Sequence, residues 1–123
     1  MTNVLIVDDD IVARVLARHI VVSSGWQPIE ASNGAEALKL FSDNDIDVVM
    51  CDQQMPGMSG LDVCSELRKI SSVPFILLTG HAAEDELDMA GNMIDSFVTK
   101  PASSAELTQT ISAALEKSTP RLG

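Results

Sequence analysis

Three short and almost uninterrupted apolar runs constrain the fold of this chain more than any other feature. They are "NVLIVD" (3–8), "DVVMCD" (47–52) and "PFILLT" (74–79). Runs of this length without polar alternation are typical of strands buried on both faces, as in a parallel sheet covered by helices. Weaker strand candidates are "QPIEA" (27–31) and "DSFVT" (95–99). The sequence therefore predicts five strands.

Segments with the apolar spacing of helices alternate with these strands. They are predicted at about 11–23, 34–43, 60–70, 84–93 and 103–117. Asn33 and Ser59 each precede such a segment and suit an N-cap, and Ser103 with Glu106 forms a capping-box pattern. Parallel strands joined by helices require right-handed crossovers. We therefore expect an α/β fold with a doubly wound, five-stranded parallel sheet and five helices.

Length and charge narrow the class of protein. A chain of 123 residues has the size of one domain, which we place at 1–118, with 119–123 as a tail or the start of a linker. A net charge of -10 disfavours direct binding to nucleic acid or to an anionic membrane. Two cysteines without the spacing of a disulfide scaffold, and a start without a signal peptide or membrane span, favour a cytoplasmic protein.

Residues with reactive side chains stand at the ends of the predicted strands. They are Asp8, Asp9 and Asp10 for the first strand, Asp52 for the third, Thr79 for the fourth, and Lys100 with Pro101 for the fifth. In a doubly wound sheet these carboxyl ends share one edge, where ligands bind. Clustered carboxylates repel one another unless a cation is present, and Mg²⁺ prefers oxygen ligands. Lys100 and Thr79 suit the charge and the oxygens of a phosphoryl group, so the pattern indicates a phosphoryl-transfer site.

Each of these residues also has a purely structural interpretation. Asp10 is well placed to cap the first predicted helix, and a threonine at a strand end is common. Lys100, directly before a proline, has the sequence context of a solvated loop residue. The combination of these side chains on consecutive strand ends is what favours a functional site.

Four segments of the chain carry a resemblance to a known family. These segments are "VDDD", "CDQQMPGMSG", "LLTG" and "FVTKP". They resemble the receiver domain of bacterial two-component response regulators, and the resemblance covers residues 3 to about 117. It implies a flavodoxin-like receiver fold with strand order 2-1-3-4-5. It also implies a phosphorylation-dependent signalling switch with low turnover, which we do not class as an enzyme.

The resemblance assigns roles to the acids. Asp52 matches the phosphoacceptor, which takes a phosphoryl group from a sensor histidine kinase or a histidine phosphotransfer protein. Asp9, Asp52 and the backbone carbonyl of Gln54 match the protein ligands of Mg²⁺, with Mn²⁺ as an alternative ion. Asp8 matches an acid that acts on the metal largely through a bound water.

The resemblance also assigns roles to the switch residues. Thr79 and Lys100 match the switch hydroxyl and the amine that pairs with phosphate, and the Lys100–Pro101 bond is expected to be cis. Phe97 matches the aromatic switch position. Gln54 and His81 match positions that tune dephosphorylation. Phosphorylation is then expected to alter the face formed by the fourth helix, fifth strand and fifth helix, which controls an output domain or partner protein.

Other classes of protein share parts of this pattern. A flavodoxin-type nucleotide binder is disfavoured because "DDD" would repel its phosphate, and a haloacid-dehalogenase-type phosphatase needs a second acid where Gln54 stands. The sequence leaves open whether the chain controls an output domain or is a stand-alone receiver that acts as a phosphorelay intermediate or phosphate sink.

Overall fold

A computed structural model describes residues 1–80 and 93–117 of the chain. Within them lies one parallel sheet, and its strands are β1 (Asn3–Val7), β2 (Gln27–Ala31), β3 (Val48–Asp52), β4 (Phe75–Thr79) and β5 (Ser96–Thr99). The strand order is β2-β1-β3-β4-β5 and every neighbouring pair is parallel. The predicted five-stranded doubly wound sheet and its order are therefore confirmed.

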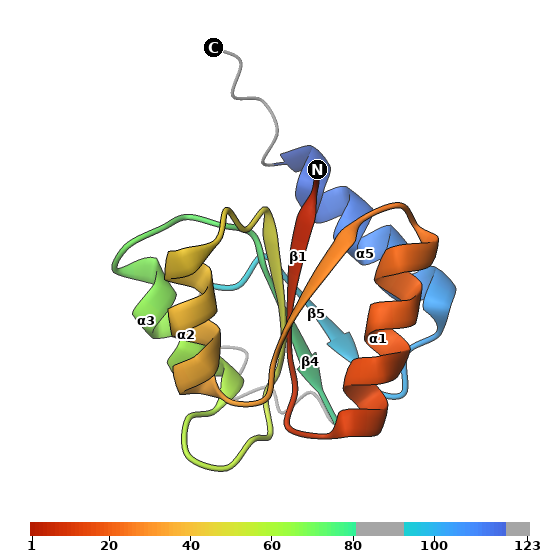
Figure 1. Cartoon of the computed structure of the whole chain (residues 1–123). Coiled ribbons are helices and arrows are strands. Elements are labelled where there is room, and N and C mark those ends of the chain that lie inside the picture. The colour runs from red at the N-terminus through yellow and green to blue at the C-terminus, as the bar shows by residue number, and fades with distance from the viewer. Residues whose placement is uncertain (81–92, 118–123) are drawn as a thin grey trace.

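Helices cover both faces of the sheet. The helices of the described residues are α1 (Ile11–Ser23), α2 (Gly34–Asp43), α3 (Gly60–Arg68) and α5 (Ser104–Lys117). Figure 1 shows α1 and α5 on one face and α2 and α3 on the other. The part of the chain that the structure describes thus holds four helices where five are expected, because almost all of the predicted helix at 84–93 lies outside it. None of the described helices is long and apolar enough to cross a bilayer.

Side-chain caps fix where the helices begin. The Oδ1 of Asn33 accepts a hydrogen bond from the N–H of Glu36 at 2.8 Å. Ser59 forms a reciprocal capping box with Asp62 at the start of α3. Asp10 caps α1 by accepting from the N–H of Val12 at 3.1 Å. These bonds satisfy helix N–H groups that lack an intrahelical partner, and they confirm the predicted cap positions at these helices.

Four strands begin or end one residue inside their predicted bounds, and acids explain two of the differences. The Oδ2 of Asp47 accepts from the N–H of Asn3 at 2.7 Å, and the Oδ2 of Asp95 accepts from the N–H of Phe75 at 2.7 Å. Each acid therefore satisfies the first N–H of a neighbouring strand instead of extending its own strand. The third helix also ends earlier than predicted, at Arg68, where the chain turns toward β4.

The apolar core lies in two layers that the sheet separates. Alternate strand residues point to opposite faces. Ile6 and Met50 belong to the cluster that includes residues of α1 and α5, whereas Leu5 and Cys51 belong to the cluster that includes residues of α2 and α3. Burying a large apolar side chain of this kind contributes about 1.5–3 kcal/mol. The two layers make the strand ends a rigid platform for polar side chains.

Candidate functional site

The register of the sheet gathers the predicted site residues at its carboxyl edge, the lower edge in Figure 1. Asp52 of β3 pairs with Leu78 of β4, and Thr79 is the next residue of β4. The backbone N–H of Lys100 donates to the carbonyl O of Thr79 at 2.8 Å, which joins the ends of β4 and β5. Asp52, Thr79 and Lys100 therefore lie on adjacent strand ends.

Three carboxylates form a cluster at this edge. Asp8, Asp9 and Asp52 each offer one oxygen, and these oxygens lie within 4.8 Å of one another. Asp8 is 3% exposed and Asp52 is 4% exposed, whereas Asp9 faces solvent. Oxygen donors this close together suit a hard divalent cation, so the cluster is able to hold a metal ion.

Lys100 is the cation that the fold itself brings to the cluster. Its Nζ lies 3.0 Å from Oδ1 of Asp52 and 3.5 Å from Oδ2 of Asp8. Burial disfavours the charged ammonium, but the hydrogen bond to Asp52 and the charges of Asp52 and Asp8 outweigh it and raise the pKa of Lys100. Lys100 therefore stays protonated and offsets part of the negative charge.

Hydrogen bonds hold the loop that carries Asp8. Its N–H donates to the carbonyl O of Ala31 at 3.1 Å, and its Oδ1 accepts from the N–H of Asp10 at 2.9 Å. Burial is the largest influence on the Asp8 carboxyl and raises its pKa. The negative charge of Asp52 adds to this effect, while the Asp10 N–H and Lys100 oppose it. The net result is a carboxyl that protonates more readily than an ordinary aspartate.

The loop after Asp52 turns sharply away from the edge. Gly57, in the "MPG" segment, has a φ of 82°, a left-handed conformation that glycine adopts without steric cost. The Oε1 of Gln53 then accepts from the N–H of Leu61 at 2.9 Å, and the carbonyl O of Gln53 accepts from the N–H of Gly60 at 3.1 Å. These bonds anchor the start of α3 directly behind Asp52.

The remaining predicted site residues differ in how far they are exposed. Thr79 is buried at the end of β4, while the side chain of Gln54 is exposed. Phe97 is 46% exposed on β5, so its ring lies outward. The Lys100–Pro101 bond is cis, as expected. His81 lies outside the described residues.

Two residues that support the site are not evident from the sequence patterns. Gln53 is buried and anchors α3, and its only sequence signal is its position directly after Asp52. Arg14 donates from Nη1 to the carbonyl O of Asp8 at 2.9 Å. The only sequence signal for Arg14 is that it lies four residues after Asp10, the N-cap of α1. This spacing places the two residues on the same side of the helix.

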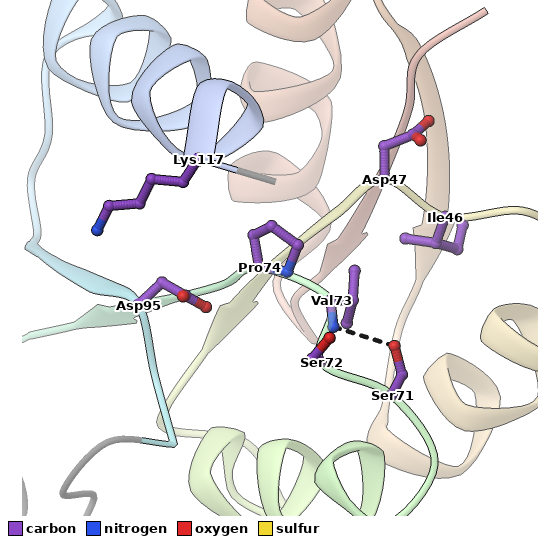
Figure 2. Close-up of a pocket in the computed structure, with 8 residues that line it drawn as sticks. All are labelled: Ile46, Asp47, Ser71, Ser72, Val73, Pro74, Asp95 and Lys117. Carbon is purple, nitrogen blue, oxygen red and sulfur yellow. Dashed lines mark hydrogen bonds between the residues drawn. The ribbon is translucent and has the colours of Figure 1, made fainter. Parts of the chain in front are cut away.

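A polar pocket at the opposite edge of the sheet is separate from this cluster. Figure 2 shows its lining, which includes Asp47, Ser71, Val73, Asp95 and Lys117, and its volume is about 480 Å³. Its polar groups serve the fold: the Oγ of Ser71 accepts from the N–H of Val73 at 3.0 Å, and Asp95 holds the start of β4. Because it lies at the amino ends of β3, β4 and β5, this pocket is remote from Asp52 in the sheet.

Comparison with known proteins places the chain in a family. A family model for the response regulator receiver domain matches residues 4–112, so the chain belongs to this family. Sensory transduction protein RegX3 of Mycobacterium tuberculosis is 38% identical over 120 residues, which are 95% of this chain and 52% of RegX3. Autoinducer 1 sensor kinase/phosphatase LuxN of Vibrio harveyi is 34% identical over 118 residues, which are 95% of this chain and 14% of LuxN.

A solved structure extends the likeness to the fold. The response regulator protein TrrA from Thermotoga maritima, in complex with Mg²⁺-BeF, is 34% identical with a TM-score of 0.85, and the match covers 94% of this chain and all of that one. The chain spans about half or less of the two curated relatives above. It is a receiver domain of two-component signalling systems, in which such domains act with histidine kinases.

Proposed function

We propose that this receiver domain is a phosphorylation-dependent signalling switch in which Asp52 accepts a phosphoryl group from a phosphohistidine. The observation that carries the proposal is the charge arrangement around Asp52. Its buried carboxylate lies among the oxygens of Asp8 and Asp9 and is 3.0 Å from Nζ of Lys100. A nucleophile flanked by metal-binding oxygens and a fixed ammonium suits transfer of an anionic group.

The residues at this edge fit Mg²⁺. Asp9, Asp52 and the backbone carbonyl of Gln54 would hold the ion, and Asp8 would act largely through a water. All of these donors are hard oxygen atoms, and the number of carboxylates leaves room for water and phosphate ligands. When bound, Mg²⁺ supplies a Lewis acid that neutralises charge on the phosphoryl oxygens. Mn²⁺ prefers similar ligands and would serve as a substitute.

Phosphoryl transfer then uses the residues of the edge. An oxygen of the Asp52 carboxylate forms a bond to phosphorus while the P–N bond of the phosphohistidine breaks. The electron pair of that bond goes to the imidazole, which takes a proton from solvent. Lys100 pairs with the phosphoryl oxygens, and the hydroxyl of Thr79 donates to one of them. The product is an acyl phosphate on Asp52.

The switch step follows from the new charge at Asp52. Thr79 and Lys100 shift toward the phosphoryl oxygens, and the outward ring of Phe97 turns into the space that Thr79 leaves. The face that β5 and α5 form with the helix predicted at 84–93 then changes and controls an output domain or partner protein. Gln54 and His81 tune how long the acyl phosphate lasts. We propose that low turnover makes the protein a switch and not an enzyme, and that it acts in the cytoplasm.

An apolar groove beside the site suits the partner that carries the phosphohistidine. The groove has a volume of about 700 Å³ and runs between α1 and the start of α5, with Leu16, Pro101 and Lys100 among its lining residues. Ile11, Val12 and Leu16 of α1 are at least 60% exposed. An apolar helix of a kinase or phosphotransfer protein can cover this surface while its histidine reaches Asp52.

The proposal is tested by incubation with a small acyl phosphate. With Mg²⁺, intact-protein mass spectrometry should show the addition of one phosphoryl group. With a chelator the addition should fall to background, because no Mg²⁺ is then present to neutralise the negative charge of the phosphoryl oxygens beside the carboxylates. Equal labelling with and without Mg²⁺ would refute the metal-dependent mechanism.

Mg²⁺ binding should also depend on pH through Asp8. Because the pKa of Asp8 is raised, mainly by burial, its carboxylate becomes protonated as the pH falls, and the affinity for Mg²⁺ falls with it. Without metal, the effect of lower pH on the stability of the fold is the reverse. The folded state binds this proton more tightly than the unfolded chain does, so protonation of Asp8 stabilises the fold. The gain in melting temperature caused by Mg²⁺ should therefore shrink as the pH falls from neutral toward the raised pKa of Asp8.

Thermal melts of the wild type and Asp8→Asn across this range provide the comparison. The variant lacks the titrating carboxyl, so its Mg²⁺ gain should change less with pH. A wild-type gain that is constant over the range would contradict the role given to Asp8.

A further inference from the structure

Arg14, in the first turn of α1, joins three segments around the carboxylate cluster. Its Nη1 donates to the carbonyl O of Asp8 at 2.9 Å, and its Nε lies 3.4 Å from Oε1 of Glu30 in β2. The side chain is 17% exposed, so most of it is shielded from solvent. Glu30 thus pairs with Nε of the guanidinium, while Nη1 of the same group holds the loop after β1. The planar guanidinium allows both contacts at once.

The carbonyl that Arg14 holds belongs to the peptide between Asp8 and Asp9. A peptide unit is planar, so holding its oxygen also holds the N–H and the Cα of Asp9. The bond from which the Asp9 side chain projects is restrained with them. The side chain of Asp9 is exposed and forms no hydrogen bond or ion pair within residues 1–80 and 93–117. Its position therefore depends on the backbone that carries it.

We infer that Arg14 is a positioning residue for the metal site: it orients the peptide before Asp9 so that the Asp9 carboxylate meets the cation. The inference rests on the proposed function, because it assigns Arg14 a role in binding the metal of that same site. Groups that orient metal ligands typically change metal affinity by about 10–100-fold when removed. Arg14 touches neither metal nor phosphate in this role and acts only through Asp9.

Electrostatics alone predicts the opposite result for loss of Arg14. A guanidinium close to the carboxylate cluster repels Mg²⁺, so removal of its charge alone should tighten metal binding. Loss of the hydrogen bond to the Asp8 carbonyl should weaken binding. The direction of the change therefore separates positioning from charge.

The chain offers a matched control in Arg18, one turn further along α1. Its Nη1 lies 3.1 Å from Oε2 of Glu30, so it pairs with the same carboxylate as Arg14. Arg18 donates a hydrogen bond to Glu30, but among the described residues it donates none to the loop after β1. Arg18→Met removes a positive charge and an ion pair to Glu30 but leaves the Asp8 carbonyl bonded.

The test is calorimetric titration of Mg²⁺ alone into the wild type, Arg14→Met and Arg18→Met, with melts to verify folding. Arg14→Met should bind Mg²⁺ about 10-fold more weakly, whereas Arg18→Met should stay within about twofold of the wild type. Equal or tighter binding by Arg14→Met would overturn the inference. If Arg14→Met does not fold, Arg14→Lys is the deciding variant, because it keeps the positive charge but lacks the planar guanidinium that makes both contacts. Wild-type Mg²⁺ affinity in Arg14→Lys would overturn the inference, and weaker binding would support it.

A metal-free readout separates this inference from the proposed function. In NMR spectra without Mg²⁺, Arg14→Met should shift the amide resonance of Asp9, and Arg18→Met should leave it in place. If the wild type fails to bind Mg²⁺, the proposed function fails, but the Asp9 resonance still reports on the peptide. An unchanged Asp9 amide in Arg14→Met would remove the basis of the positioning role.

Discussion

Asp52→Asn is expected to reduce phosphoryl acceptance from a small acyl phosphate in Mg²⁺ to background. The amide of asparagine is a poor nucleophile and carries no charge to hold a divalent cation. Asp8 and Asp9 offer oxygens within 4.8 Å, but neither lies at the end of β3, and Asp8 is farther from Nζ of Lys100, at 3.5 Å against 3.0 Å for Asp52. Intact-protein mass spectrometry measures the result. Labelling of Asp52→Asn at the wild-type level would place the phosphoacceptor elsewhere.

Stability distinguishes this loss from unfolding. Asp52 lies among two other carboxylates, so its replacement by a neutral residue of the same shape relieves repulsion in the metal-free protein. The asparagine Oδ1 can still accept from Lys100. The melting temperature of Asp52→Asn should therefore equal or exceed that of the wild type. Asp47→Asn, directly before the start of the same strand, is the matched control and should label normally.

The sheet was predictable because burial on both faces leaves a direct mark on sequence. Val48, Val49 and Met50 are all almost fully buried, so their strand is an unbroken apolar run with little polar alternation. Its end was predictable for the same reason, since Asp52 breaks that run. The starts of strands were less predictable, because Asp47 serves the N–H of Asn3, a residue 44 positions away.

The clustering of polar residues at one edge of the sheet was also predictable, but the contacts that hold these residues were not. Asp8, Asp52 and Thr79 are buried polar residues at strand ends, where topology alone brings them together. The bond of Arg14 to the Asp8 carbonyl and that of Gln53 to the Leu61 N–H depend on side-chain directions. Spacing along the chain constrains these directions only loosely, so such supporting residues emerge only from the structure.

Gly60→Ala is expected to lower stability and to slow phosphoryl acceptance together. A Cβ at Gly60 would lie 2.6 Å from the carbonyl O of Asp52, 2.7 Å from Cδ1 of Leu77 and 3.0 Å from Cα of Gln53. Two of these atoms belong to the backbone, so α3 or the end of β3 must move. Overpacking of this kind costs about 1–3 kcal/mol, against a gain of at most about 1 kcal/mol from helix propensity.

The matched control for Gly60→Ala is Gly80→Ala, next to Thr79. A Cβ at Gly80 meets nothing within 4 Å of the described structure, and its φ lies outside the left-handed region. Gly80→Ala should leave the melting temperature unchanged or raise it slightly, by reducing the freedom of the unfolded chain. Gly60→Ala should lower it, by up to about 12 °C for a net cost of up to about 3 kcal/mol. Because the displaced atoms include the backbone of Asp52 itself, only the Gly60 variant should also lose labelling rate at a temperature where both variants are folded. Gly60→Ala with wild-type melting and labelling would show that α3 can retreat without moving Asp52.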